Sequence, residues 1–383
     1  MSDCDVAVVG AGVVGAATAL ALARRGASVA LLEAEPEPGL AASGTNSGIL
    51  HTGFDSKPGE LETELILRSA ALRDRVLGAL GVPVLRCGAL LRPLRHDQRD
   101  TVAALAAGAA RNGVEVRLRD RDGALLVTGE SVTDPVRYTL ALVAAAERHG
   151  ARLRTGFRVA SISRDGEGLV LDDPAGERMR CRAAVNCAGL HADEVARLAG
   201  DDSFEVYPRK GEFLVFEPPA GEPLECILLP VPSERTKGML VFPTVDGHVV
   251  AGPTAIDQDD KNDWSVRAGA RDEILRSVTS LWPAIEGAEP IAAYAGLRPA
   301  GRGVNYLIGR SAACSALVNV AAIRSTGLTA SLGIAEHVCG IVGRLGVELG
   351  PERPLAPGPA PASGGPPAPG GEWWRRTAEH RAP

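Results

Sequence analysis

The sequence predicts an α/β fold that begins with a parallel βαβ unit and contains a second, mainly antiparallel sheet. At the start of the chain, two short apolar runs flank an Ala-rich stretch, an order typical of a buried parallel sheet. In the middle of the chain, short apolar runs alternate with Pro and Gly turns, which favours strands with tight connections. With 383 residues, 45% of them hydrophobic, the chain is long enough for one large or two interleaved domains.

The first βαβ unit is expected near the N-terminus. Residues 5–9 are apolar and bounded by Gly10, which indicates a buried strand. Residues 13–25 follow as a helix, and residues 27–32 form a second apolar run that ends in Glu33. A unit of this kind requires a parallel sheet that is covered on both faces.

The remaining elements are expected in order along the chain. Residues 40–53 are rich in Gly, Ser, Thr and Asn and predict a loop over a ligand. Asp134 and Pro135 predict a helix start, with Asp134 as the N-cap. Helices are expected at 60–78, 100–112, 135–149, 268–281 and 327–345, a hairpin at 84–94, and strands at 154–163, 168–172, 179–185, 210–216, 239–244, 249–252 and 317–323.

Composition excludes several classes of protein. The formal net charge is -6 and no block of like charges stands out, so nucleic acid is not an expected partner. The seven cysteines show no short metal-site or dithiol spacing, and no metal is expected. Without a signal-peptide pattern or 18 consecutive apolar residues, we expect a cytoplasmic protein, with peripheral membrane contact left as an alternative.

The C-terminal end has a different composition. Residues 351–371 are almost entirely Pro, Ala, Gly and Ser, which predicts a disordered Pro/Gly-rich tail over 351–383. The Trp-Trp-Arg-Arg sequence at 373–376 suggests contact with a membrane interface or a partner, and its role stays open.

A dinucleotide fingerprint lies between the first strand and the first helix. Gly10 permits the tight turn, Gly12 lets the backbone approach a pyrophosphate, and Gly15 lets the helix pack closely on the strand; Val14 lies in the same motif. Glu33 ends the second strand, where a carboxylate accepts hydrogen bonds from a ribose diol and disfavours a 2′-phosphate. The alternative is a tight turn in an unliganded α/β protein.

Further motifs complete a resemblance to a known family. Residues 184–189 (AVNCAG), 296–299 (GLRP) and 325–329 (STGLT) resemble the FAD-dependent D-amino-acid oxidase superfamily. Residues 46–53 (NSGILHTG) and 238–255 (GMLVFPTVDGHVVAGPTA) resemble its glycerol-3-phosphate oxidase/dehydrogenase and L-2-hydroxyglutarate oxidase branch. The resemblance covers roughly residues 3–345.

The resemblance implies a domain organisation. A Rossmann-like FAD-binding domain would be interleaved with a second α+β substrate domain built on the mainly antiparallel sheet. The FAD-binding domain would take residues 1–80, 134–200 and 290–350, and the substrate domain residues 81–133 and 201–289.

The resemblance also implies non-covalent FAD. The flavin ring would meet the start of the last helix, whose N-terminus stabilises negative charge on a reduced flavin. Residues 298–301, beside the flavin, contain no Cys for covalent attachment. Besides the fingerprint and Glu33, the implied FAD contacts are Ser47, Gly48, Val159, Ala188, Gly189, Gly327, Leu328 and Thr329.

His51, Arg298, Tyr294 and Lys261 are candidates for catalysis, and Lys210 is a further one. By the resemblance, His51 belongs to the active site, and a neutral imidazole there takes a hydroxyl proton; the alternative is a loop hydrogen bond. Arg298 follows Tyr294 in the sequence YAGLRP (294–299) and suits a bidentate clamp on a carboxylate or phosphate; the alternative is a structural salt bridge. Lys261 and Lys210 either meet an anionic substrate or are solvated charges.

The expected function is oxidation of the CH–OH of a small anionic substrate, glycerol 3-phosphate or an L-2-hydroxy acid, by hydride transfer to flavin N5. Oxygen, or a quinone or other carrier, would accept the electrons. One alternative is an amine oxidase acting on the CH–NH of an amino acid or N-methyl amino acid. Another is a flavin-binding protein without turnover, or one acting on tRNA, which the acidic balance disfavours.

Overall fold

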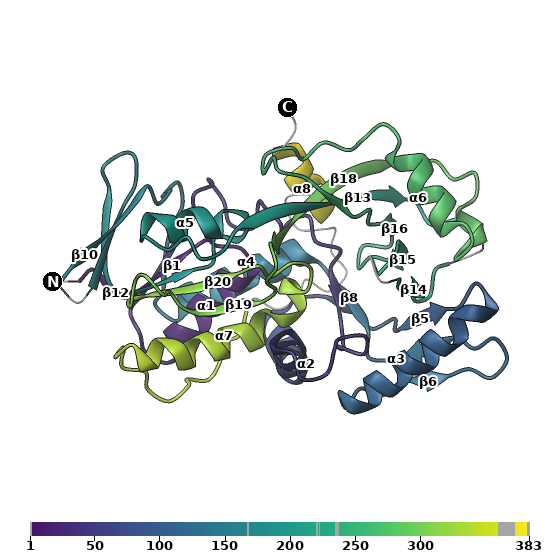
Figure 1. Cartoon of the computed structure of the whole chain (residues 1–383), viewed down its shortest axis with the longest axis horizontal. Helices are drawn as coiled ribbons and strands as arrows, with labels where there is room; N and C mark the ends of the chain where they lie inside the picture. The colour runs from purple at the N-terminus through teal and green to yellow at the C-terminus, as the bar shows by residue number, and fades with distance from the viewer. Residues whose placement is uncertain are drawn as a thin grey trace.

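Two large sheets lie side by side along the long axis of the molecule, and the chain passes between them several times (Figure 1). The computed structural model describes residues 2–166, 168–219, 221, 223–233, 237–358 and 372–380. One sheet has a parallel, Rossmann-like centre and the other is mainly antiparallel, which confirms the predicted fold class.

The first sheet contains the predicted βαβ unit. Its eight strands are β10 (Ser161–Asp165), β11 (Gly168–Asp172), β12 (Arg178–Asn186), β1 (Cys4–Val9), β2 (Val29–Leu32) and β9 (Arg152–Arg154) in sheet order, with β20 (Leu317–Ala321) beside β12 and β19 (Leu307–Arg310) beside β20. Strand β1 pairs in parallel with both β2 and β12. Val6 and Val8 pack into one core, whereas Ala7 and Val9 pack into another. Both faces of β1 are therefore buried, as its uninterrupted apolar sequence predicts.

Helices cover both faces of this sheet. Helices α1 (Val13–Arg24), α2 (Leu61–Leu80), α4 (Pro135–Arg148) and α7 (Gly327–Arg344) pack together over one face, and α5 (Ala192–Leu198) packs against β20 and β12. The predicted start of α4 is confirmed, because the Asp134 side chain accepts hydrogen bonds of 2.9 Å from the backbone N–H groups of Val136 and Arg137.

The second sheet has nine strands. They are β17 (Ile256–Asp257), β13 (Val206–Phe216), β16 (Val249–Gly252), β15 (Leu240–Pro243), β14 (Ile227–Pro230), β5 (Ala89–Arg92), β7 (Leu125–Val127) and β6 (Arg117–Leu118) in sheet order, with β18 (Ala292–Gly301) pairing with β13. Helix α3 (Arg99–Arg111) contributes to the core on one side and α6 (Ala270–Val278) to the core on the other. Only the pair of β14 with β5 is parallel among these described strands.

A small sheet and three 3-10 helices complete the described elements before residue 359. The small sheet is formed by β3 (Ile49–Leu50), β8 (Ser131–Thr133) and β4 (Val84–Leu85), and the 3-10 helices are His96–Gln98, Gly189–His191 and Pro283–Ile285. The hairpin predicted at 84–94 is wrong, because β4 pairs with β8 and β5 pairs with β7 and β14. Strand β18, which the sequence assigned to the FAD-binding domain, pairs with β13 of the second sheet.

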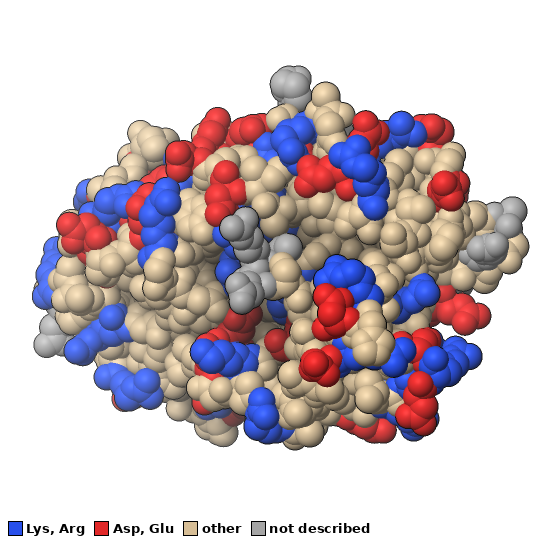
Figure 2. Space-filling model, turned by 45° about the vertical axis from the view of Figure 1, so that its right-hand side comes forward, with Lys and Arg blue, Asp and Glu red and all other residues tan. Residues whose placement is uncertain are grey.

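Charged side chains of both signs are interspersed over the face shown in Figure 2. This face has no broad surface of one sign to attract a polyanion. In the part of the chain that the structure describes, no helix is both long and apolar enough to span a membrane.

The C-terminal segment is attached to the body of the molecule. The backbone N–H of Gly350 donates to the carbonyl of Arg25 at 2.8 Å, and the N–H of Gly358 donates to that of Ala79 at 2.9 Å. Residues 351–358 thus run along α1 and α2 and differ from the disordered tail expected over 351–383. Residues 359–371, which carry most of the Pro/Gly prediction, lie outside the described residues.

Helix α8 (Trp373–His380) also differs from that expectation. Trp373 and Trp374 are buried, with 3% and 2% of their surface exposed. The Trp373 ring meets the edge of Tyr294 with centroids 5.6 Å apart, and Trp374 meets His248 in the same manner at 5.9 Å. The two indoles supply the apolar area that the surrounding composition lacks, and the helix packs on residues of the second sheet.

We expect Trp373→Ala to lower the free energy of unfolding by about 3 kcal/mol, because it removes a large buried side chain and leaves a cavity. Chemical denaturation measures the change. The control is Leu118→Ala, which removes a side chain that is 48% exposed and should change stability by no more than about 0.5 kcal/mol. Equal stability of both variants would show that α8 does not contribute to the folded state in solution.

Candidate active site

A cavity of about 790 Å³ opens between the two sheets. One side is formed by the carboxyl ends of β1 and β2 and by the start of α7, and the other by residues of β13, β15 and β18. A crevice beyond the carboxyl ends of parallel strands is the usual binding place in an open α/β sheet. The cavity volume suits a cofactor together with a small substrate.

The glycine-rich turn between β1 and α1 forms one wall. Gly10 has a φ of 100°, and a Cβ atom there would lie 2.5 Å from the carbonyl oxygen of Cys187. A Cβ on Gly15 would lie 1.9 Å from the Gly10 carbonyl oxygen, so both positions require glycine. Gly12 caps α1 without a side-chain hydrogen bond and lines the cavity with Val14. The positive N-terminal end of helix α1 therefore faces the cavity.

Glu33 lies at the end of β2, where the sequence predicts a ribose contact. Its carboxylate accepts hydrogen bonds from the backbone N–H groups of Ala11 at 2.7 Å and Glu35 at 3.0 Å. Burial raises the pKa of this carboxyl group. Val159 lines the cavity near the same end, since Phe157, two residues earlier, donates its backbone N–H to the Glu33 carbonyl at 2.9 Å.

Most of the other residues predicted to contact the cofactor line the same cavity. These are Ser47, Ala188, Gly189, Gly327 and Leu328. Gly48 and Thr329 do not line it but support the loop: a Cβ on Gly48 would lie 2.1 Å from the Thr133 carbonyl oxygen, and Thr329 accepts the backbone N–H of His51 at 3.1 Å.

His51 lines the cavity next to β3 and forms a pair with a buried carboxylate. Its Nδ1 lies 2.9 Å from Oε2 of Glu130, which is 1% exposed. Oε1 of the same carboxylate accepts from the backbone N–H of Thr52 at 2.6 Å and from its hydroxyl at 2.8 Å. Because the carboxylate accepts, Nδ1 of His51 donates, and the neutral ring keeps an acceptor at Nε2.

Arg298 lines the cavity from β18. Its guanidinium donates to the Thr254 carbonyl oxygen at 3.1 Å and forms no ion pair within the described residues. Burial, reinforced by the positive charges of Arg209 and Arg324, lowers its pKa to about 10. The guanidinium has room only because residue 211 is glycine: a Cβ there would lie 2.0 Å from Nη2 of Arg298.

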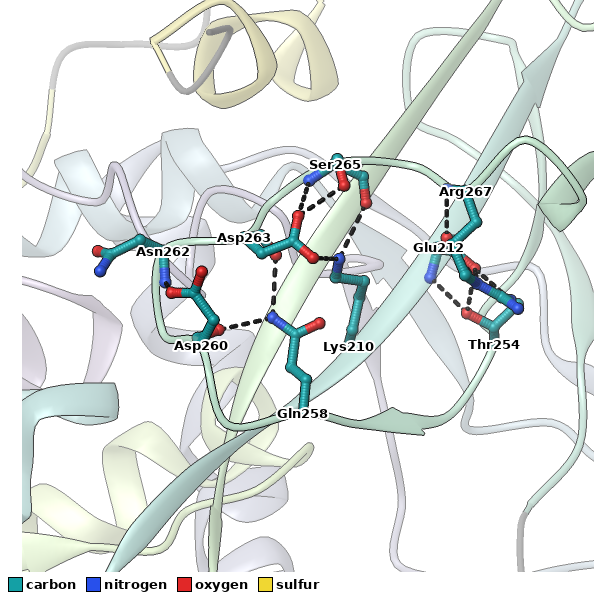
Figure 3. A network of polar contacts seen from close by, with 9 residues as sticks. All are labelled: Lys210, Glu212, Thr254, Gln258, Asp260, Asn262, Asp263, Ser265 and Arg267. Carbon is teal, nitrogen blue, oxygen red and sulfur yellow. Dashed lines mark hydrogen bonds and ion pairs between the residues drawn. The ribbon is translucent and has the colours of Figure 1, made fainter.

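A hydrogen-bonded loop at residues 258–267 forms part of the cavity rim (Figure 3). Two buried residues of β13 hold it from below: Lys210 contacts Asp263 Oδ2 at 2.6 Å, and Glu212 binds Arg267 at 2.7 Å. Glu212 also accepts the hydroxyl of Thr254 at 3.0 Å. The same strand therefore fixes the rim loop and the residue whose carbonyl orients Arg298. Lys210 is committed to this loop and does not line the cavity.

Two of the predicted catalytic residues make other contacts than the sequence predicts. Lys261 lines the cavity but pairs with Asp193 and Glu194 of α5, each at 2.8 Å, so its charge is already balanced. Tyr294 does not line the cavity; it is 2% exposed and stacks on Phe213 with centroids 4.8 Å apart. Tyr294 precedes Arg298 by four residues on one strand, about 13 Å along β18, and therefore lies beyond the cavity edge.

Sequence reasoning missed the residues that hold the site together. Glu130 follows Thr128-Gly129 and belongs to no recognisable motif. Nothing in the sequence around Gly211 predicts that the guanidinium of Arg298 packs against this glycine. Lys237, which contacts Asp55 at 2.6 Å on the cavity wall, was also missed. Within the described residues, no group of His, Cys, Asp or Glu side chains is arranged to hold a metal ion.

Comparison with known proteins supplies a family context. Residues 5–341 match the family model described as "FAD dependent oxidoreductase". The chain is 28% identical over 353 residues to glycerol 3-phosphate dehydrogenase of Caloramator mitchellensis, covering 88% of this chain and 73% of that protein. It is 29% identical over 284 residues to mitochondrial L-2-hydroxyglutarate dehydrogenase of Bos taurus, covering 67% and 61%.

A solved structure matches the fold over most of its length. Dithionite-reduced L-alpha-glycerophosphate oxidase from Mycoplasma pneumoniae, with FAD bound, superposes with a TM-score of 0.87 at 24% identity. The match covers 94% of this chain and 99% of that one. The arrangement of both sheets is therefore shared with that structure.

Proposed function

The chain belongs to the family of FAD dependent oxidoreductases, and we propose that it oxidises the CH–OH of a small anionic substrate. Glycerol 3-phosphate and L-2-hydroxy acids are the substrate classes that we propose, because the similar proteins named above act on glycerol 3-phosphate or L-2-hydroxyglutarate. The alternative is oxidation of a CH–NH group, which the same fold could also carry out. The substrate screen described below distinguishes the two reactions.

The cavity fits FAD. Gly10 and Gly12 place no side chain of the turn itself between a diphosphate and the N-terminus of α1, where the Ser43 hydroxyl accepts the N–H of Val13 at 2.9 Å. The Glu33 carboxylate accepts hydrogen bonds from two backbone N–H groups, and its remaining lone pairs can accept hydrogen bonds from ribose hydroxyls. The start of α7, at Gly327 and Leu328, lines the cavity with its positive end, where a reduced flavin carries negative charge. We propose that FAD is held there without a covalent bond.

The observation that carries the proposal is that His51, paired with Glu130, and Arg298, without a carboxylate partner within the described residues, line one cavity. A base and an anion clamp facing the same space suit an alcohol whose neighbouring group is acidic. FAD, when bound, supplies the two-electron chemistry by accepting hydride at N5.

The protein's own residues would bind and orient the substrate. Arg298 would clamp the acidic group in bidentate fashion and so fix which carbon faces the cofactor. His51 would take the hydroxyl proton at Nε2, while Glu130 stabilises the positive charge that the ring gains. Oxygen, or a quinone or other carrier, would take the electrons from the reduced protein.

A substrate screen with the purified holoprotein tests the proposal. We expect a yellow protein that releases intact FAD on acid or heat denaturation. Under anaerobic conditions, glycerol 3-phosphate or an L-2-hydroxy acid should bleach the flavin absorbance of this protein. Glycine, proline and N-methyl amino acids are the comparison set. Bleaching only by the amino compounds would reject CH–OH oxidation, and flavin that stays with the denatured chain would reject non-covalent binding.

A further inference from the structure

The lysines and arginines that line the cavity are Arg158, next to Val159 in the sequence, and five others that fall into two groups. Three of them already have acidic partners: Lys237 with Asp55, Lys261 with Asp193 and Glu194, and Arg209 with Asp257. Two others at the substrate end, Arg298 and Arg324, have no ion pair among the described residues. The site assigned to the substrate therefore carries more positive charge than one acidic group neutralises.

Arg324 is placed to act on the same ligand as Arg298. It lies in the loop between β20 and α7, three residues before the start of α7, and lines the cavity with an exposed side chain. The two arginines reach the cavity from different elements, β18 and this loop. Burial lowers the pKa of Arg298, and the positive charges of Arg209 and Arg324 lower it further.

We propose that Arg324 is a specificity-determining residue, which supplies a second positive charge beside Arg298 and makes the cavity select dianions over monoanions. This inference rests on the proposed function of the site. A monoanion clamped by Arg298 leaves Arg324 uncompensated, whereas a phosphate monoester or a dicarboxylate neutralises both. Asp257 does not cancel the excess positive charge, because both of its carboxylate oxygens already accept hydrogen bonds from Arg209.

Binding of unreactive anions to the holoprotein tests this charge selection directly, through the change in flavin absorbance. Methyl phosphate, a dianion at pH 8, is compared with dimethyl phosphate, a monoanion of similar shape; succinate is compared with succinamate. These two pairs separate a compact dianionic group from two carboxylates. In the unaltered protein we expect at least one dianion to bind about tenfold more tightly than its monoanionic partner.

In Arg324→Gln we expect this preference to fall to about twofold, with little change in binding of the monoanion. Arg310→Gln is the control, since Arg310 is an exposed arginine on β19 that does not line the cavity, and it should keep the full preference. Equal binding of dianion and monoanion in the unaltered protein, or an undiminished preference in Arg324→Gln, would overturn the inference.

These outcomes are separable from failure of the proposed function. If the substrate screen finds CH–OH oxidation but the anion preference does not depend on Arg324, only the present inference fails. If the screen finds oxidation of amino compounds alone, the proposed function fails first, and retention of a dianion preference would still support a second charge at Arg324.

Discussion

His51→Ala is expected to slow flavin reduction by the best substrate about 10²- to 10⁴-fold, the usual contribution of a positioned general base. The variant should keep its FAD, because the His51 side chain bonds to Glu130 and not to the glycine-rich turn. Anaerobic stopped-flow measurement of flavin bleaching at saturating substrate gives the rate. Substrate affinity should change less than the rate, since Arg298 supplies the anion contact in our proposal.

The matched variant is Glu130→Gln, which keeps the shape of the side chain and removes its charge. It should also slow reduction, because the amide no longer stabilises a protonated His51. The pH at which the rate reaches half its maximum should move in Glu130→Gln, which a purely structural role would not cause. A normal reduction rate in His51→Ala would remove the base assignment, and an unchanged pH profile in Glu130→Gln would remove the positioning role of Glu130.

The cofactor half of the site was predictable because its signals are local. A buried strand, three glycines within six residues and an acid at the end of the next strand lie within residues 5–33, and Gly10, Gly12 and Glu33 line one cavity wall. Parallel pairing of β1 with β2 places Glu33 beside the turn by register alone.

The substrate half was less predictable because its contacts join residues that are distant in sequence. His51 meets Glu130 across 79 positions, and Lys261 meets Asp193 across 68. Tyr294 and Arg298 share a motif, but only the length of β18 determines that one lies inside the cavity and the other outside it. The packing of α8 was also not predicted, because the Pro/Gly-rich composition before it indicated disorder, whereas the helix is anchored by two buried tryptophans.

Arg298→Lys is expected to raise the KM for the substrate about 10- to 150-fold, which corresponds to roughly 1.5–3 kcal/mol for lost hydrogen bonds to a charged group. Lysine keeps the charge but cannot bind a carboxylate or phosphate through two parallel N–H groups. The turnover number at saturating substrate should fall less. Steady-state kinetics with the best anionic substrate gives both constants. A preferred substrate without an acidic group, or an unchanged KM, would remove the clamp assignment.

Gly211→Ala tests the same clamp without altering Arg298 itself. The new methyl group would lie 2.0 Å from Nη2 of Arg298, so the guanidinium must move and the KM should rise as in Arg298→Lys. Gly309→Ala is the control: this strand glycine on β19 has no heavy atom within 4 Å of the added carbon and should leave the KM unchanged. A normal KM in a folded, FAD-containing Gly211→Ala would mean that the position of the guanidinium, as distinct from its charge, does not determine binding.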